Sequence, residues 1–186
     1  MNIAHLEEYS YIYGPGCRYV IWVQGCSIRC KGCWNKEMWN FETKQEFSVY
    51  ELINKILKEK EFIEGVTILG GEPFDQYNEL FELSKLIHEN KLSLILYTGY
   101  EKEEFKNKNY LEIVNYIDIL ISGRYNEKFR NMQLGLIGSS NQTIDFYSDR
   151  YCQNDLSKTN EVEITLTNSG KLELYGYPEN TNKKYP

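Results

Sequence analysis

The stretch RYVIWVQGCSIRCKGCWN, residues 18–35, joins a short apolar run to three cysteines that crowd into eight positions. The apolar run ends in glycine and predicts a strand that delivers the cysteine loop from its C-terminal end. Cys26, Cys30 and Cys33 follow the pattern C-x-x-x-C-x-x-C. A structural metal site normally uses four protein ligands. The loop therefore raises the question of what fills the fourth position.

Three kinds of site compete for these cysteines. A structural zinc site would need a remote fourth ligand such as Cys17 or His5, but zinc sites usually present two separated ligand pairs and the sequence holds no second pair. A thioredoxin-like dithiol of Cys30 and Cys33 would leave Cys26 unexplained. A 4Fe-4S cluster on three thiolates uses all of them, because one of its irons then keeps an open coordination position.

The composition limits the partners and the compartment. The formal charge of the chain is -6, so a basic nucleic-acid-binding surface is not expected. The N-terminal stretch MNIAHLEEYSYIYGPG lacks a basic region followed by an apolar run, and no segment approaches the roughly 20 apolar residues that span a bilayer. Five cysteines are an odd number for a disulfide framework and suit a reducing compartment. A cytoplasmic protein with no membrane partner is expected.

The chain is predicted to form a single domain. Its 186 residues are the size of one ordinary domain, and no internal repeat, low-complexity tract or linker marks a boundary. Residues 1–186 are therefore assigned to one domain, whose last residues, ENTNKKYP, are expected to fray.

Strand-like and helix-like runs alternate along the chain. Apolar runs predict strands at 18–25, 65–71, 92–100 and 116–123, and helix-like runs fall at 47–62, 76–91 and 101–115. The first helix starts with Ser48 and Glu51 in capping-box spacing. Such alternation implies right-handed crossovers and a parallel sheet with helices outside it. The predicted fold class is α/β, a partial (β/α) barrel of mainly parallel strands with outer helices.

A C-terminal β-hairpin is predicted in addition. Residues 161–178, EVEITLTNSGKLELYGYP, alternate in polarity around a turn signal at 168–170. Val162, Ile164 and Leu166 alternate with polar residues, so one face of the hairpin is expected to be buried, either on a sheet edge or in an interface.

A second motif, LGGEPF, ends the strand predicted at 65–71. On its own this motif is read most simply as a turn, because Gly and Pro punctuate loops. The carboxyl ends of parallel strands meet at one rim of a sheet, where ligands bind, so the motif and the cysteine loop are expected to converge. Glycine permits close backbone approach to a ligand, and Glu72 offers an acceptor for an ammonium group.

With these two motifs on consecutive strand ends, the sequence resembles the radical S-adenosylmethionine enzymes. The resemblance implies that Cys26, Cys30 and Cys33 are catalytic and hold a 4Fe-4S cluster, whose fourth iron is chelated by the amino and carboxylate groups of S-adenosylmethionine. Two further candidate cofactor contacts are chosen for their positions: Thr98 lies at the end of the third predicted strand, and Trp34 lies beside a cluster cysteine. The expected contacts are Gly70, Gly71, Glu72, Pro73, Thr98 and Trp34.

The likeness is closest to one family, the anaerobic ribonucleotide reductase activating proteins. The segments GPGCRYVIWVQGCSIRCKGCWN, GGEPF, YTGY, DILISGRY and GSSNQ resemble those proteins in order and in spacing, over roughly residues 10–145. Gly32, before the third cysteine, also fits them. Two departures are Arg124, where a proline is expected, and residues 150–186, which extend beyond these short proteins.

The resemblance implies an oxidoreductase that works under anaerobic conditions. Such an enzyme reductively cleaves S-adenosylmethionine to a 5'-deoxyadenosyl radical, which installs a glycyl radical on a partner enzyme such as anaerobic ribonucleotide reductase. Flavodoxin or ferredoxin is expected as the electron donor. Fold and cofactor site do not specify the substrate, so one alternative is a radical enzyme that modifies a small molecule or a ribosomal peptide, with the hairpin helping to enclose it. The second alternative is a noncatalytic iron-sulfur or zinc module. In such a module the presence of Glu72 and its glycines at the next strand end would be a coincidence.

Overall fold

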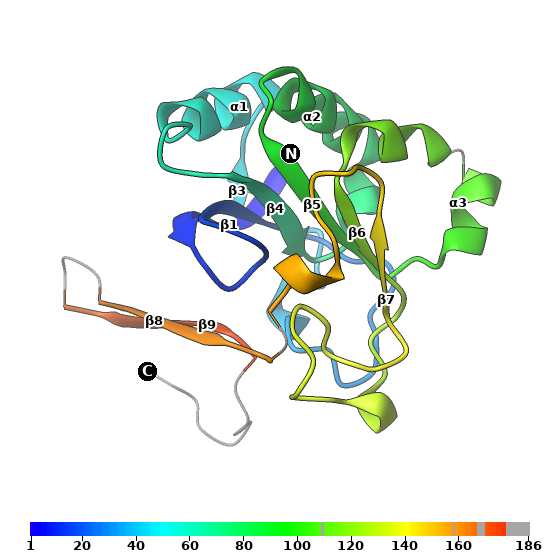
Figure 1. Cartoon of the computed structure of the whole chain (residues 1–186). Coiled ribbons are helices and arrows are strands. Elements are labelled where there is room, and N and C mark those ends of the chain that lie inside the picture. The colour runs from blue at the N-terminus through cyan, green and yellow to red at the C-terminus, as the bar shows by residue number, and fades with distance from the viewer. Residues whose placement is uncertain (109, 158, 167–169, 178–186) are drawn as a thin grey trace.

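The computed structural model describes residues 1–108, 110–157, 159–166 and 170–177 (Figure 1). Its strands are β1 (Asn2–Ser10), β2 (Arg18–Val23), β3 (Gln45–Glu46), β4 (Gly65–Gly70), β5 (Ser93–Thr98), β6 (Ile119–Ser122), β7 (Thr143–Phe146), β8 (Val162–Leu166) and β9 (Leu172–Gly176). Its α-helices are α1 (Val49–Lys58), α2 (Tyr77–Glu89) and α3 (Lys102–Lys108). Short 3-10 segments lie between them: η1 (Lys36–Met38), η2 (Pro73–Gln76), η3 (Leu111–Tyr116), η4 (Glu127–Phe129) and η5 (Gln153–Asp155).

Strands β1 to β7 form one mixed sheet in the order β3-β1-β2-β4-β5-β6-β7. The central strands β2, β4, β5 and β6 pair in parallel, and β1 and β7 flank them antiparallel. Strands β3 and β7 lie at opposite ends of this order, so the sheet is open and forms only part of a barrel. The predicted α/β class of mainly parallel strands, with a separate C-terminal hairpin, is confirmed.

The central strands are buried on both faces. Every residue of β2 is buried, which is usual for a parallel strand covered on two sides and explains the continuous apolar sequence that follows Arg18. The edge strand β1 is absent from the strands predicted from the sequence. Its residues alternate irregularly between buried and exposed, and its pairing with β2 contains two register shifts, so no period-2 pattern marks it.

The helices cover one face of the sheet (Figure 1). Helix α1 starts at the predicted capping box, in which the Glu51 amide donates to Ser48 Oγ at 3.2 Å and the Ser48 amide donates to the Glu51 carboxylate at 2.7 Å. The prediction of one continuous helix over 101–115 is wrong, since α3 ends at Lys108 and the 3-10 segment η3 follows. In the part of the chain that the structure describes, no helix is long and apolar enough to cross a membrane.

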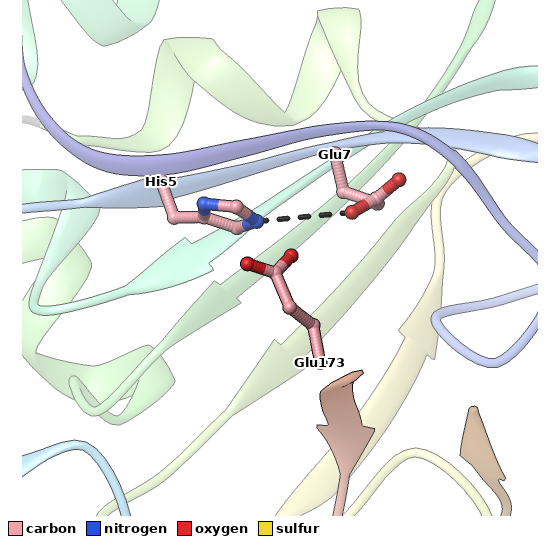
Figure 2. Close-up of side chains that lie close together, drawn as sticks. All are labelled: His5, Glu7 and Glu173. Carbon is pink, nitrogen blue, oxygen red and sulfur yellow. Dashed lines mark ion pairs between the residues drawn. The ribbon is translucent and has the colours of Figure 1, made fainter. Parts of the chain in front are cut away.

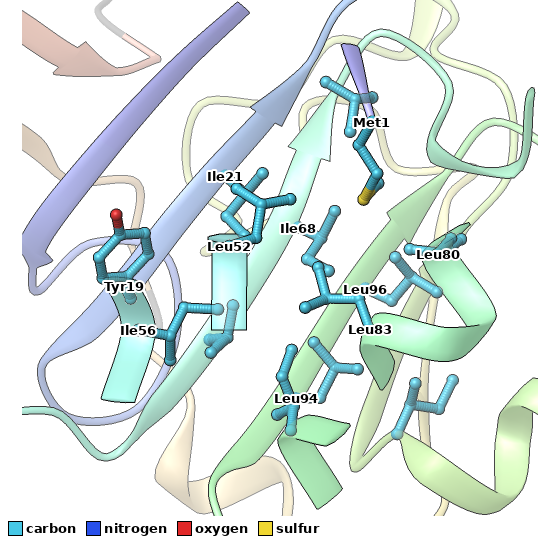
Figure 3. Packing of buried hydrophobic residues seen from close by; sticks show 14 of the residues in the cluster. Met1, Tyr19, Ile21, Leu52, Ile56, Ile68, Leu80, Leu83, Leu94 and Leu96 are labelled. Atoms are coloured by element: carbon cyan, nitrogen blue, oxygen red, sulfur yellow. The ribbon is translucent and has the colours of Figure 1, made fainter. Parts of the chain in front are cut away.

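The main core lies between the sheet and these helices (Figure 3). Fully buried strand residues such as Ile21 and Ile68 pack against helix residues such as Leu52, Leu80 and Leu83. Burying each of these side chains contributes about 1.5–3 kcal/mol relative to leaving it in water. The core therefore fixes β2 and β4 side by side, and with them the loops that leave their C-terminal ends.

The C-terminal hairpin β8–β9 packs over the opposite side of the sheet, on β1 and β2. The His5 ring and the Tyr175 hydroxyl are hydrogen-bonded at 2.9 Å, and Ser10 Oγ donates to Glu163 at 2.5 Å. Figure 2 shows His5, Glu7 and Glu173 pointing toward one another at this junction. Polar and aromatic side chains thus hold the hairpin on the sheet.

The apolar face of the hairpin is not buried against the sheet of this chain, so its expected burial on a sheet edge is wrong. Ile164 and Leu166 are 66% and 67% exposed, and Val162 and Leu172 are exposed beside them. Strands β8 and β9 pair antiparallel, so the opposite face carries Glu163 across from Tyr175, and this is the face that meets β1. The turn at 168–169 and the expected fraying at 179–186 lie outside the described residues.

Candidate functional site

The cysteine loop leaves β2 at the rim of the sheet and closes on the segment after it. The Gly25 amide donates to the Met38 carbonyl at 2.9 Å, and the Cys26 amide donates to the Trp39 carbonyl at 3.2 Å. Within the loop, the Cys33 amide donates to the Cys30 carbonyl at 3.1 Å. These main-chain bonds hold the three cysteines on one folded loop rather than on a mobile extension.

The GGEP segment at the end of β4 lies directly against the cysteine loop. A Cβ added to Gly71 would come within 2.1 Å of the Gly25 carbonyl oxygen, and Gly70 adopts a φ of 110°, which favours glycine. The Gly71 amide donates to the Val23 carbonyl and the Glu72 amide donates to the Gly25 carbonyl, both at 2.8 Å. The two glycines therefore let the second motif approach the first, as their positions at consecutive strand ends predict.

Glu72 is a buried carboxylate at this rim. It is 1% exposed and accepts three hydrogen bonds, from the Phe74 amide at 3.0 Å, from Thr98 Oγ1 at 2.8 Å and from the Gly99 amide at 2.8 Å. Burial raises its pKa to about 7, against the opposing effect of these donors. An ionised carboxylate has about four acceptor positions, so Glu72 keeps capacity for one further donor.

Two of the predicted contacts hold Glu72 in place. Thr98, at the end of β5, donates its hydroxyl proton to Glu72 and accepts the Tyr100 amide at 3.0 Å. Pro73 is buried and starts the 3-10 segment η2, for which its fixed φ is suited. Direct contact of Thr98 or Pro73 with a cofactor stays a prediction.

One cavity of about 240 Å³ gathers most of these side chains. Its lining includes all three cysteines of the loop and five of the six expected cofactor contacts. These lining residues are Cys26, Cys30, Cys33, Trp34, Gly70, Gly71, Glu72 and Thr98. The remaining residue, Pro73, is buried behind the rim. Residues from three strand ends therefore converge at one site.

The thiols at this site are free and differ in burial. Cys26 is buried, whereas Cys30 and Cys33 are half-buried. Burial raises the pKa of Cys26 and of Cys30, so binding a metal there would displace thiol protons.

Trp39 adds an orphaned donor to the same cavity. Its Nε1 is buried and has no hydrogen-bond partner among the described residues, while the indole lines the cavity. A buried N–H without an acceptor costs about 1–3 kcal/mol. The three free thiols and the close glycine cradle at this cavity fit a 4Fe-4S cluster with a small polar ligand beside it.

The C-terminal extension forms a wall of the cavity through side chains that no sequence motif marks. Tyr177 packs edge-on against Trp34, with ring centroids 5.0 Å apart, and its hydroxyl donates to the Tyr125 hydroxyl at 2.8 Å. The Arg130 guanidinium lies 4.3 Å from the centre of the Tyr177 ring. Trp34 thus sits at the rim of the cavity, between the cysteine loop and the extension.

Arg124, which departs from the expected proline, has a structural partner. Its guanidinium donates two hydrogen bonds to the Glu104 carboxylate, at 2.6 and 2.9 Å, and so ties α3 to the end of β6. This pairing lowers the pKa of Glu104 to about 2. The polar residues around Ser139 form a turn, in which Gln142 Oε1 accepts the Gly138 and Ser139 amides.

Known proteins resemble the chain over this same region. Residues 12–145 match the family described as 4Fe-4S single cluster domain. The anaerobic ribonucleoside-triphosphate reductase-activating protein of Enterobacteria phage T4 is 33% identical over 163 residues, which cover 83% of this chain and 100% of that protein. The protein of the same name from Escherichia coli (strain K12) is 27% identical and covers 77% of this chain and 97% of its own length.

Two further similarities are more partial. The pyruvate formate-lyase-activating enzyme of Clostridium pasteurianum is 32% identical over 64% of this chain and 50% of its own length. Among solved structures, QueE from Escherichia coli superposes with a TM-score of 0.40 and 24% identity, covering 53% of this chain and 51% of that chain. The family match spans the cysteine loop, the GGEP segment and Thr98, and the phage relative is covered from end to end. The chain therefore belongs to the 4Fe-4S single cluster domain family, together with the anaerobic ribonucleoside-triphosphate reductase-activating proteins.

Proposed function

We propose that the chain is a radical S-adenosylmethionine enzyme that installs a glycyl radical on a partner enzyme, anaerobic ribonucleotide reductase being the first candidate. The observation that carries the proposal is the convergence of three free cysteines and the buried Glu72 on one cavity. Relatives that share this family are named as activating proteins of anaerobic ribonucleoside-triphosphate reductase and of pyruvate formate-lyase.

In this proposal Cys26, Cys30 and Cys33 hold the 4Fe-4S cluster through their thiolates and leave its fourth iron open. The cluster, when bound and reduced by flavodoxin or ferredoxin, supplies the electron that cleaves S-adenosylmethionine to methionine and a 5'-deoxyadenosyl radical. Glu72 accepts the ammonium group of the cofactor with its remaining acceptor position, and Gly70 and Gly71 let the backbone approach it.

The walls of the cavity exclude water from this chemistry. Apolar and aromatic side chains, Ile28, Trp34 and Tyr97 among them, line the cavity beside the cysteines. A carbon radical reacts with whatever contacts it, so a site that excludes solvent protects the intended hydrogen abstraction. Five free thiols and an oxygen-sensitive cluster suit a reducing, anaerobic cytoplasm, which is the proposed compartment.

The test is an anaerobic reconstitution of the purified protein with iron and sulfide. About four irons per chain are expected. Dithionite and S-adenosylmethionine should then yield 5'-deoxyadenosine. Cys26→Ala, Cys30→Ala and Cys33→Ala should each abolish cleavage, whereas Cys152→Ala, at an exposed cysteine outside the cavity lining, should not. A folded protein that binds stoichiometric zinc and never forms 5'-deoxyadenosine would contradict the proposal.

A second candidate is a radical enzyme that modifies a small molecule or a peptide. It is favoured by one observation, the cavity wall that Asn160, Glu161 and Tyr177 of the extension form. Incubation with purified anaerobic ribonucleotide reductase separates the candidates. A glycine-centred doublet in electron paramagnetic resonance supports the activating function, and its absence from a preparation that cleaves S-adenosylmethionine supports the second candidate.

A further inference from the structure

Asp75 joins the GGEP side of the site to the cysteine loop. It lies in η2, three residues after Glu72, and its carboxylate accepts the Ser27 amide at 2.6 Å and Ser27 Oγ at 2.8 Å. The Tyr100 hydroxyl approaches the same carboxylate at 3.4 Å. Ser27 directly follows Cys26, so Asp75 holds the main chain on the C-terminal side of the first cysteine.

The N-terminal side of Cys26 is held from the same short segment. The Glu72 amide donates to the Gly25 carbonyl at 2.8 Å, and Gln76 Nε2 donates to the Gln24 carbonyl at 3.2 Å. Residues 72–76 therefore hydrogen-bond to the chain both before and after Cys26. Among the described residues, Asp75 provides the only charged group that takes part in these hydrogen bonds.

Asp75 also affects the charge around the proposed cluster. Reduction adds an electron to a cluster, so a nearby negative charge disfavours the reduced form, and hydrogen bonds donated to sulfur favour it. The Asp75 carboxylate brings a negative charge next to the Cys26 loop and engages two donors of Ser27 that lie one residue from the sulfur. Both effects act in the same direction.

We propose that Asp75 is a positioning residue for Cys26 that also keeps the reduction potential of the bound cluster low. The inference rests on the proposed function in one respect, the presence of the cluster. The positioning role does not need the cluster, because its hydrogen bonds are made by the protein alone. A low potential serves a site that must pass an electron to a sulfonium.

The first measurement is hydrogen exchange of the metal-free protein, read at the Ser27 amide. In Asp75→Ala the exchange should be roughly tenfold faster than in the wild type, because a hydrogen bond to a charged group is lost. Asp75→Asn keeps a carbonyl oxygen for the amide and should exchange at a rate between the two. Asp155→Asn is the matched control, since Asp155 accepts the Cys152 amide at 2.7 Å away from the cavity lining.

The second measurement is a redox titration of the reconstituted protein, followed by electron paramagnetic resonance. Asp75→Asn should bind as much iron as the wild type and show a more positive midpoint potential. The variant Ser27→Ala keeps the Asp75 carboxylate and its hydrogen bond from the main-chain amide of residue 27. Its midpoint potential should therefore stay closer to the wild-type value than that of Asp75→Asn. Asp155→Asn should change neither iron content nor potential.

The outcomes separate the inference from the proposed function. Wild-type exchange at Ser27 together with an unchanged potential in Asp75→Asn would overturn the inference while leaving the function intact. A wild-type protein that takes up no cluster would overturn the proposed function and the claim about the potential, and the exchange rates would still decide the positioning role. If Asp75→Ala fails to fold, the exchange and potential of Asp75→Asn decide both claims.

Discussion

Gly71 lies so close to Gly25 that a single added carbon would collide with it. The added Cβ would stand 2.1 Å from the Gly25 carbonyl oxygen and 3.1 Å from the Val23 carbonyl oxygen. Both of those oxygens accept amides of the GGEP segment at 2.8 Å. The contact between the two motifs is therefore made by the main chain, and it needs a residue without a side chain.

Gly71→Ala should separate the two motifs. Because the neighbouring atoms are backbone, the clash cannot be relieved by a side-chain rotation, and we expect a loss of about 1–3 kcal/mol of unfolding free energy and of most iron uptake. Urea denaturation and iron analysis after reconstitution measure the two effects. Gly170→Ala, whose added Cβ meets nothing within 4 Å, should keep full iron uptake, and normal iron uptake by Gly71→Ala would contradict the expectation.

Glu72 should make the stability of the metal-free protein depend on pH. Burial raises the folded-state pKa of this carboxyl from 4.5 to about 7, so between these values the unfolded chain ionises first. Its contribution to stability is present below pH about 4.5 and is lost as the pH rises through about 7. The full difference corresponds to about 3 kcal/mol, at about 1.4 kcal/mol for each pH unit.

Denaturation at several pH values measures this loss against Glu72→Gln, which cannot ionise. Relative to that variant, the wild type should lose about 3 kcal/mol between pH about 4 and pH about 8. Glu89→Gln, at an exposed position near the end of α2, should follow the wild-type curve. Parallel curves for the wild type and Glu72→Gln would show that this carboxyl has the same pKa in the folded and the unfolded protein, and would contradict the expectation.

Much of the site could be predicted from the sequence, because its parts are local motifs at predictable places. The cysteine loop and the GGEP segment each follow a strand whose continuous apolar run marks it as buried on both faces. Parallel neighbours end at the same rim, so the convergence of Cys26 and Glu72 follows from the strand order alone.

The rest depends on contacts between distant segments that no local pattern records. Trp39 and Tyr177 line the cavity, yet each is an ordinary aromatic residue in its own stretch of sequence. For Asp75 the sequence offers only a weak indication of a role at the site, namely its position three residues after Glu72. In the hairpin, the alternation identifies two faces but not which one meets the sheet. That choice is made by His5 and Ser10 on β1, which offer hydrogen-bond partners.

Tyr177 should hold the extension against the mouth of the cavity. Removing its ring in Tyr177→Ala eliminates the contacts with Trp34 and Arg130, which are each worth about 0.5–1.5 kcal/mol. Limited proteolysis within the hairpin should then be about tenfold faster than in the wild type. Tyr177→Phe keeps both ring contacts and should stay within about threefold of the wild type. Equal cleavage rates for all three proteins would mean that Tyr177 does not hold the extension.

Because of the orientation of the hairpin, replacing an apolar residue should destabilise the protein less than replacing a residue of its polar, aromatic face. Ile164 is 66% exposed, so Ile164→Thr, which keeps the β-branch, should change the unfolding free energy by less than about 0.5 kcal/mol. Tyr175 stacks near Trp22, with ring centroids 5.7 Å apart, and bonds to His5 at 2.9 Å, so Tyr175→Ala should cost about 2 kcal/mol. Urea denaturation of both variants measures the difference. If the apolar face were instead packed on the sheet, Ile164→Thr would be the more damaging change, since it would bury a hydroxyl in place of an ethyl group.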